Sequence, residues 1–248
     1  MNITGIIPAR YASTRFPGKP LADINGKSMI QRVYEQASKA KSLNSVVVAT
    51  DDQRIFDHVM QFGGRVIMTA SHHTNGTSRC HEVLTKLSVE RNKIDAVINI
   101  QGDEPFIMPR QIDDLAALFS DDNTHIATMA KIIDNNNEIE DPNTVKVVTD
   151  INGFALYFSR QPIPYIREKE NNTKKNRHLF YKHIGIYGYR SQVLKQIVLL
   201  KPTPLESAEK LEQLRWLENG FRIKVKTTDF DSVSVDTPAD LEKIIRNS

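Results

Sequence analysis

Three cationic side chains fall within ten residues, directly after the first apolar run of the chain. In ARYASTRFPGKPL, Arg10, Arg15 and Lys19 stand beside Gly18 and follow residues 3–8, which predict a strand. The loop that leaves the carboxyl end of a strand is where open α/β sheets bind ligands. Guanidinium groups grip phosphate oxygens in pairs and a lysine adds a mobile charge, so the loop predicts a polyphosphate site. A solvated basic loop is the alternative, and the GxxxxGK[ST] spacing of a Walker-type ATPase is missing.

Acidic side chains occur at two places that are far apart in the sequence. Asp103 and Glu104 follow the apolar residues 96–100, and Asp236 ends a predicted strand in DSVSVD, directly before a helix. Magnesium usually takes one or two carboxylates together with substrate phosphates and waters. We therefore predict that Asp103 and Asp236 bind Mg²⁺. Taken alone, Asp236 would be better explained as a capping acid, and we expect Asp240 to complete that cap.

The elements that must position these groups alternate between strand and helix. Residues 3–8, 45–50 and 96–100 are short apolar runs rich in β-branched side chains, as strands buried on both faces should be. Residues 29–40 and 55–62 carry apolar side chains at helical spacing. This alternation predicts an α/β fold with a mostly parallel sheet flanked by helices.

The middle of the chain changes pattern and predicts an antiparallel sub-lobe. Asn152-Gly153, between two β-rich runs, is a strong signal for a tight hairpin turn. We expect a polar exposed loop at 167–177, a strand through HIGIYGY, a helix at 207–218 that stops at Asn219-Gly220, and a last helix at 239–245. Thr237 and Pro238 are the expected cap and first-turn residues of that last helix.

Composition bounds the kind of protein. The 248 residues contain a single cysteine, Cys80, and carry a net charge of +3 from 33 basic and 30 acidic side chains. A balanced charge does not indicate nucleic-acid binding, and one cysteine cannot form a disulfide within the chain. No apolar run approaches the length of a membrane span, and the first residues do not form a signal peptide. We expect a cytoplasmic protein that binds neither nucleic acid nor membrane.

Six strings occur in order over nearly the whole chain: PARYASTRFPGKPL, NIQGDEP, LYFSR, HIGIYGYR, EKLEQLR and VDTPADL. Together they closely resemble the 3-deoxy-manno-octulosonate (Kdo) cytidylyltransferases, also called CMP-Kdo synthetases. The resemblance implies a Rossmann-like nucleotidyltransferase fold, a homodimer, Mg²⁺ as cofactor, and transfer of CMP from CTP to Kdo for lipopolysaccharide synthesis, with release of pyrophosphate. It also implies a single domain, 1–248, in which 1–120 and 221–248 form the nucleotide core and 121–220 the sugar-binding and dimerisation sub-lobe.

The same resemblance assigns roles to individual residues. The catalytic set would be Arg10, Lys19, Asp103 and Asp236. Nucleotide binding would involve Ala9, Arg10, Arg15, Lys19, Asn75, Gly76, Thr77, Arg79 and Gln101, and sugar binding would involve Gln101, Arg160, His183, Tyr187, Glu212 and Gln213. Arg160 is the expected partner of the sugar carboxylate, because guanidinium matches carboxylate in a bidentate pair. Without the resemblance, His183 would be interpreted as a packing residue and Glu212 as part of a solvent-facing helix surface.

One segment departs from the family pattern. Where the family usually has SGTER near the cytosine, this chain has NGTSR, so Asn75 replaces serine and Ser78 replaces glutamate. The preference for cytosine over uracil is therefore open, as is the choice between Kdo and amino-substituted Kdo. Three other hypotheses stay open: a sialic-acid cytidylyltransferase, a neutral-sugar nucleotidyltransferase, and a nucleotide sensor without catalytic activity.

Overall fold

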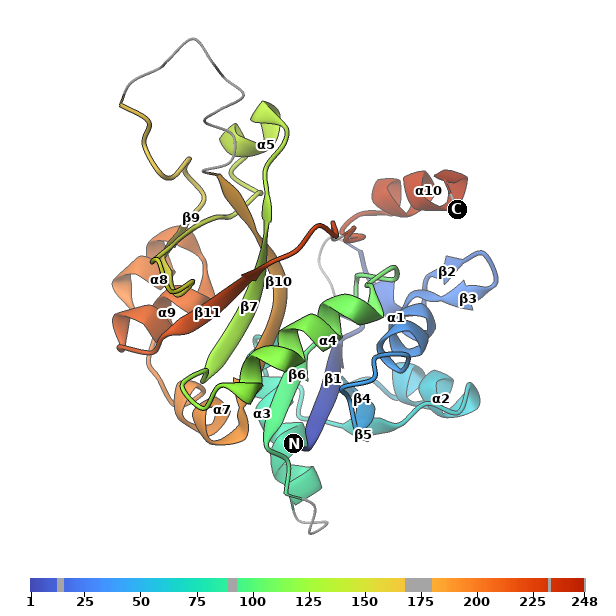
Figure 1. Ribbon diagram of the computed structural model, residues 1–248. Helices are drawn as coiled ribbons and strands as arrows, with labels where there is room; N and C mark the ends of the chain where they lie inside the picture. The colour runs from blue at the N-terminus through green and yellow to red at the C-terminus, as the bar shows by residue number, and fades with distance from the viewer. Residues whose placement is uncertain (13–15, 89–92, 168–179, 232, 248) are drawn as a thin grey trace.

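The protein forms one twisted sheet with helices on both faces (Figure 1). The computed structural model describes residues 1–12, 16–88, 93–167, 180–231 and 233–247. The predicted phosphate residue Arg15 and all but the first residue of the predicted loop 167–177 lie outside these ranges. Within them, no helix combines the length and apolarity that crossing a membrane requires.

Among the described residues the main sheet has nine strands, seven of which follow the spatial order β11-β7-β10-β6-β1-β4-β5. Their bounds are β1 Ile3–Ala9, β4 Ser45–Thr50, β5 Val66–Met68, β6 Ala96–Asn99, β7 Ile126–Ile132, β10 Tyr181–Arg190 and β11 Ile223–Thr227. Strand β10 is antiparallel to both of its neighbours, β6 and β7, whereas all the other pairs along this order are parallel. The predicted mostly parallel α/β sheet is confirmed.

The central strands are apolar on both sides because both faces of the sheet are covered. In β1, Ile6 belongs to one buried cluster and Ile7 to the other, and in β6 Val97 and Ile98 divide in the same way. Helices α1, α2 and α4 cover one face, and α3, α7 and α9 cover the other. The helices are α1 Met29–Ala37, α2 Gln53–Gln61, α3 Gly76–Ser88, α4 Pro109–Ala117, α5 Asn136–Glu140, α7 Ser191–Ile197, α8 Pro204–Glu209, α9 Glu212–Glu218 and α10 Pro238–Asn247, with short 3-10 turns at Lys19–Leu21 and Leu118–Ser120.

Antiparallel pairs are added to this frame. Strands β8 (Lys146–Thr149) and β9 (Ala155–Ser159) form the predicted hairpin, and β8 also pairs with the start of β10. Gly153 has φ of 73°, the left-handed conformation that the turn requires and that glycine adopts without strain. A separate small sheet pairs β2 (Asp23–Ile24) with β3 (Lys27–Ser28). Strands β7 and β10, which lie in the predicted sub-lobe 121–220, belong to the main sheet. The division of the chain at residue 121 stays a prediction.

Two expectations about local structure were wrong. The helix predicted at 207–218 is two helices, α8 and α9, because Lys210 adopts a left-handed conformation with φ of 55° and ends the first one. The strand predicted before Asp236 does not form: Val235 is buried but Val233 is 49% exposed. The alternating pattern there does not mark a sheet, because the backbone N–H of Val235 donates to the carbonyl of Asp103 instead of to a neighbouring strand.

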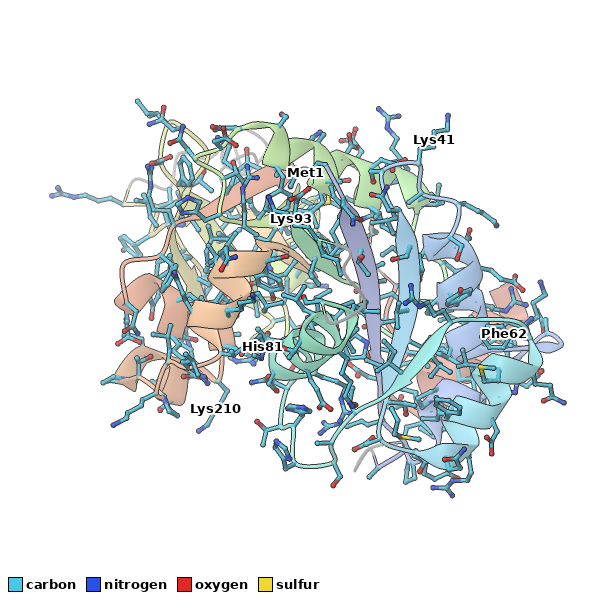
Figure 2. All side chains as sticks on the ribbon, turned by 90° about the horizontal axis from the view of Figure 1, so that it is seen from below. Met1, Lys41, Phe62, His81, Lys93 and Lys210 are labelled. Carbon is cyan, nitrogen blue, oxygen red and sulfur yellow. The ribbon has the colours of Figure 1, made fainter. Side chains whose placement is uncertain are left out.

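The two ends of the parallel strands differ in character. At the amino end, Asn2 binds the carbonyl of Lys93 and the carboxylate of Asp95, so the chain start lies beside the residues that lead into β6 (Figure 2, where Met1 and Lys93 are labelled). At the carboxyl end, the loops after β1 and β6 carry charged residues that the sequence analysis selected. This end positions the candidate site.

Candidate active site

Two adjoining polar cavities lie at the carboxyl ends of the central strands. The first, of about 350 Å³, is lined by the loops after β1 and β6, the start of α3, and part of α9. The second, of about 680 Å³, lies between β10, residues 143–145, the start of α9 and the segment before α10. Both cavities are lined by Gln101, Asp103, Tyr187, Gln213 and Asp236. The two cavities therefore adjoin at these five side chains.

Asp103 and Asp236 converge, although 133 positions separate them in the sequence. The ammonium group of Lys19 lies 2.7 Å from Asp103 Oδ2 and 3.4 Å from Asp236 Oδ1. The bond from Val235 N to Asp103 O, 2.9 Å long, brings the two loops together. The structure thus brings the two acids together beside a cation of the first loop, and their binding of Mg²⁺ stays a prediction.

The acid pair suits a magnesium ion. The single ammonium group of Lys19 lies within ion-pair distance of both carboxylates, so one cation can contact the two acids at once. Both acids are partly exposed and line the first cavity. Among the described residues no group of three His, Cys, Asp or Glu side chains forms a complete metal site. Two carboxylates are what Mg²⁺ uses when substrate phosphates and waters complete its octahedron.

Asp240 has the capping role that was expected of it. Its Oδ2 accepts bonds from Thr237 N and Thr237 Oγ1 at 2.9 and 2.8 Å, and Thr237 Oγ1 accepts from Asp240 N at 3.2 Å. This reciprocal arrangement at the first turn of α10 holds the residue directly after Asp236. Asp240 therefore stabilises the helix start.

The loop after β1 presents its cations to the first cavity. Arg10 is exposed and Ala9 is buried, and both line the cavity together with Lys19. Gly18 has φ of 74°, and a Cβ there would lie 3.1 Å from the ring of Tyr11, so a side chain at this position would be strained and crowded. Glycine thus permits the tight turn that returns Lys19 to the acids.

The start of α3 forms the opposite wall. Asn75 Oδ1 accepts from Ser78 N at 2.8 Å, so the asparagine that replaces serine serves as a helix N-cap. Gly76 packs against Asn99, and Thr77 donates to Glu212 Oε2 at 2.9 Å. This cap takes up the side-chain oxygen of Asn75, which leaves its amide N–H groups as the polar atoms for a ligand.

Removal of that cap has a measurable cost. We expect Asn75→Ala to lower the free energy of unfolding by about 1 kcal/mol, the usual effect of replacing an N-cap asparagine by alanine. Asn75→Ser should retain most of the stability, since its hydroxyl can still accept from Ser78 N. Urea unfolding of the three proteins measures both effects. An alanine variant as stable as the wild type would show that this cap contributes nothing.

Arg79 is held behind the cavity wall. It is only 3% exposed, and it donates to Thr69 Oγ1 at 2.5 Å and to Asp51 Oδ2 at 3.2 Å. These partners follow β5 and β4, so the guanidinium ties the ends of two strands to α3. Arg79 lines the first cavity, while its Nη1 and Nη2 donate to these two side chains.

The predicted sugar residues, with one exception, gather where the two cavities meet. Gln101 Nε2 donates to Gly185 O at 2.7 Å. His183 lines the second cavity, Glu212 the first, and Tyr187 and Gln213 line both. Burial raises the pKa values of Glu212 and Tyr187.

His183 is a neutral ring with a defined tautomer. Burial lowers its pKa to about 3, so it is uncharged at neutral pH. Its Nε2 lies 2.9 Å from Thr128 Oγ1, and that hydroxyl donates to carbonyl oxygens of β10 at 2.8 and 3.1 Å. Because the hydroxyl proton is used there, Nε2–H is the donor to Thr128, and Nδ1 is left as an acceptor.

Arg160 is the exception. It does not line either of the two cavities. Its Nε donates to Glu209 O at 2.7 Å and its Nη1 to Pro142 O at 2.9 Å, while its backbone N–H donates to the Glu209 carboxylate. In this conformation the side chain braces two loops behind the second cavity.

Several lining residues were not selected from the sequence. His73, Asn99, Tyr189 and Trp216 line the first cavity, and Lys182 and Asp231 line the second. Asn99 carried a usable signal, because a polar residue inside the apolar run AVINI has to face a partner or a ligand. The indole N–H of Trp216 is buried without a hydrogen-bond partner among the described residues. Such a donor beside a cavity is a position where a ligand acceptor would be favourable.

Comparison with known proteins gives a consistent result. The family model described as Cytidylyltransferase matches residues 4–226. The 3-deoxy-manno-octulosonate cytidylyltransferases of Parabacteroides distasonis and Cytophaga hutchinsonii are 54% and 50% identical to this chain, and the matches cover 99% and 100% of it and 97% and 98% of those proteins.

Solved structures agree with these matches. One of CMP:2-keto-3-deoxy-manno-octonic acid synthetase complexed with CTP is 42% identical, with a TM-score of 0.90, and the match covers 100% of this chain and 98% of that one. The 4-diphosphocytidyl-2C-methyl-D-erythritol synthase of Anaerococcus prevotii, 13% identical with a TM-score of 0.65, covers 99% of this chain and 95% of its own, and it shares the fold alone.

Proposed function

Because the chain belongs to the family of 3-deoxy-manno-octulosonate cytidylyltransferases, we propose that it transfers CMP from CTP to Kdo and releases pyrophosphate. The observation that carries this proposal is the shared cation position of Asp103 and Asp236, which lies at the junction of two cavities and beside the cationic loop. One cavity suits a nucleotide and the other an acceptor. A transfer reaction needs both in contact.

Asp103 and Asp236 are the proposed ligands of Mg²⁺. When bound between them, the ion would supply positive charge to the triphosphate and polarise the phosphate that is attacked. Arg10, Arg15 and Lys19 would balance the remaining charge, as guanidinium and ammonium groups do for phosphates. The contact of Lys19 with both acids supports this arrangement, because the lysine already lies where phosphate and metal would meet.

In this reaction the protein mainly aligns the two substrates and forms no covalent bond to them. The anomeric hydroxyl of Kdo attacks the α-phosphorus of CTP, and pyrophosphate leaves from the opposite side. The residues lining the cavities hold the two reactants in line and neutralise the charge that moves to the leaving group. No side chain is assigned as the general base.

The acceptor is proposed to bind where Gln101, His183, Tyr187, Glu212 and Gln213 meet. Nδ1 of His183 can accept from a sugar hydroxyl, and the amide groups of Gln101 and Gln213 can donate as well as accept. Arg160 stays the proposed partner of the sugar carboxylate, through N–H groups that do not bond Glu209 or Pro142. Asn75, Gly76, Thr77 and Arg79 remain the proposed wall for the nucleotide.

The test is pyrophosphate release with CTP and Mg²⁺ against a panel of acceptors. We expect turnover with Kdo to exceed that with a sialic acid or a neutral sugar, and UTP in place of CTP to reveal the effect of Asn75 and Ser78. Amino-substituted Kdo belongs in the same panel. Absence of pyrophosphate with every acceptor, combined with tight CTP binding, would favour the sensor hypothesis and contradict the proposal.

Assembly and location follow from the same family membership. We expect a homodimer in the cytoplasm, where CTP is available, and both statements stay predictions. They are supported by the relatives' role as biosynthetic enzymes and by the ordinary globular composition.

A further inference from the structure

Lys146 is a charged side chain that the proposed chemistry does not use. It is the first residue of β8 and has an exposed fraction of 0%. Its Nζ donates to the carbonyl of Asp141 at 2.9 Å and to the carbonyl of Thr144 at 2.5 Å. Burial lowers the pKa of this ammonium group, so the fold keeps a cation where an apolar side chain would avoid the desolvation.

The loop that Lys146 holds is a wall of the second cavity. Asn143, Thr144 and Val145 all line it. The carbonyl of Val145 accepts from His183 N at 2.8 Å, so the loop is tied directly to the residue proposed to face the sugar. Displacement of this loop would change the shape of the acceptor cavity at its centre.

A second cation holds the same loop from behind. Arg160 Nη1 donates to the carbonyl of Pro142, and its Nε donates to the carbonyl of Glu209 at the end of α8. Lys210 and Leu211, which follow Glu209, also line this cavity, and Figure 2 labels Lys210 near the orange helices. The carbonyls of residues 141, 142 and 144 therefore all accept from buried or half-buried cations, and Arg160 links the loop to the end of α8.

The side chain of Asp141 closes the loop on its exposed side. Its Oδ1 accepts from Asn143 N at 2.9 Å and from Asn143 Nδ2 at 3.1 Å. These bonds are local, and they set the turn without tying it to the rest of the fold. Lys146, itself a residue of β8, adds two bonds that join the turn to the sheet, beside the bond from His183 N to Val145 O. A part-buried carbonyl that loses its donor is costly, so removal of the ammonium group should loosen the turn.

We propose that Lys146 is a positioning residue that sets the shape of the acceptor cavity and thereby the affinity for the sugar. This inference rests on the proposed function, in which the second cavity takes Kdo. The first cavity contains no residue of the 141–146 segment among its lining residues, so CTP binding should not depend on Lys146.

The test compares Lys146→Met with Lys226→Met. Lys226 is a strand lysine of β11 whose Nζ pairs with Asp114 at 2.9 Å, away from both cavities, so it controls for loss of a lysine charge. In Lys146→Met we expect the KM for Kdo to rise about 10- to 100-fold, because misplacing a binding group by about 1 Å has effects of this size. The KM for CTP should stay within about twofold, and Lys226→Met should change neither constant.

If Lys146→Met does not fold, a second variant and a second measurement still test the proposal. Asp141→Ala loosens the same loop from its exposed side and is expected to raise the KM for Kdo without changing the KM for CTP. Hydrogen exchange should be faster at the amides of Asn143 and Thr144 in either variant. Equal losses of CTP and Kdo affinity, or an unchanged KM for Kdo, would overturn the inference.

Failure of the proposed function is distinguishable from failure of this inference. A wild-type protein that does not use Kdo refutes the function, and the same ratio of KM values is then measured for the acceptor it does use. If that ratio is also unchanged in Lys146→Met and Asp141→Ala, the positioning role is refuted as well.

Discussion

Asp103→Asn should lose on the order of 10³-fold or more in turnover, while its affinity for CTP falls much less. Asparagine keeps the size of the side chain and one carbonyl oxygen, and it removes the negative charge that, with Asp236, attracts a cation. Lys19 would also lose its 2.7 Å ion-pair partner. CTP would still be held by the cationic loop and by the wall at the start of α3. The rate of pyrophosphate release and calorimetric binding of CTP measure the two quantities separately.

The control for this variant is Asp113→Asn. Asp113 lies on α4, where its Oδ1 accepts from Ser42 N at 2.8 Å, and it does not line either cavity. Its substitution is expected to leave turnover unchanged. Turnover of Asp103→Asn at the wild-type level would remove Asp103 from the proposed metal site and leave Asp236 as a helix-capping neighbour.

The convergence of Asp103 and Asp236 was predictable because it depends on topology. Acids that follow strands of one sheet at their carboxyl ends must lie at the same edge, whatever their separation in the sequence. Asp103 follows a strand, as predicted. Asp236 also lies at this edge of the sheet, but the segment before it is not the predicted strand. The backbone bond from Val235 to Asp103 helps to place it, and side-chain patterns carry no information on such a bond.

The apolar strands were predictable for a simple reason. Both faces of the parallel sheet are covered, so runs such as SVVVAT have to be apolar throughout. The break at Lys210 was not predictable, because a left-handed lysine has no sequence signature comparable to glycine. It rotates α9 relative to α8 and buries Gln213 and Trp216. Glu212, which helical spacing alone placed on a solvent face, therefore lines the cavity.

Arg160 and Lys146 illustrate a further limit. Their nearest partners are the backbone carbonyls of Asp141, Pro142, Thr144 and Glu209. Every residue presents the same backbone carbonyl group. No pattern of residue types therefore indicates which carbonyl a given cation will bind. Lys146 can thus support a wall of the second cavity without facing the ligand.

Removal of divalent metal with EDTA should abolish pyrophosphate release, and addition of Mg²⁺ in excess should restore it. The same treatment should leave the thermal midpoint of the protein without substrate nearly unchanged. The reason is that the ammonium group of Lys19 already contacts both Asp103 and Asp236, and it offsets part of their mutual repulsion when no divalent ion is bound. A site whose acids lacked such a partner would be destabilised by chelation.

Lys19→Met separates the two roles of that lysine. The variant leaves the acids facing one another, so EDTA should now lower the thermal midpoint, and Mg²⁺ should raise it in a concentration-dependent way. Lys226→Met again serves as the matched control and should behave like the wild type. Turnover that survives EDTA in the wild type would contradict a magnesium role for Asp103 and Asp236. A midpoint of Lys19→Met that responds to neither EDTA nor Mg²⁺ would mean that the two carboxylates do not share a divalent ion. Removal of the ammonium group makes this position more negative, and a divalent ion bound there should then stabilise the fold more strongly.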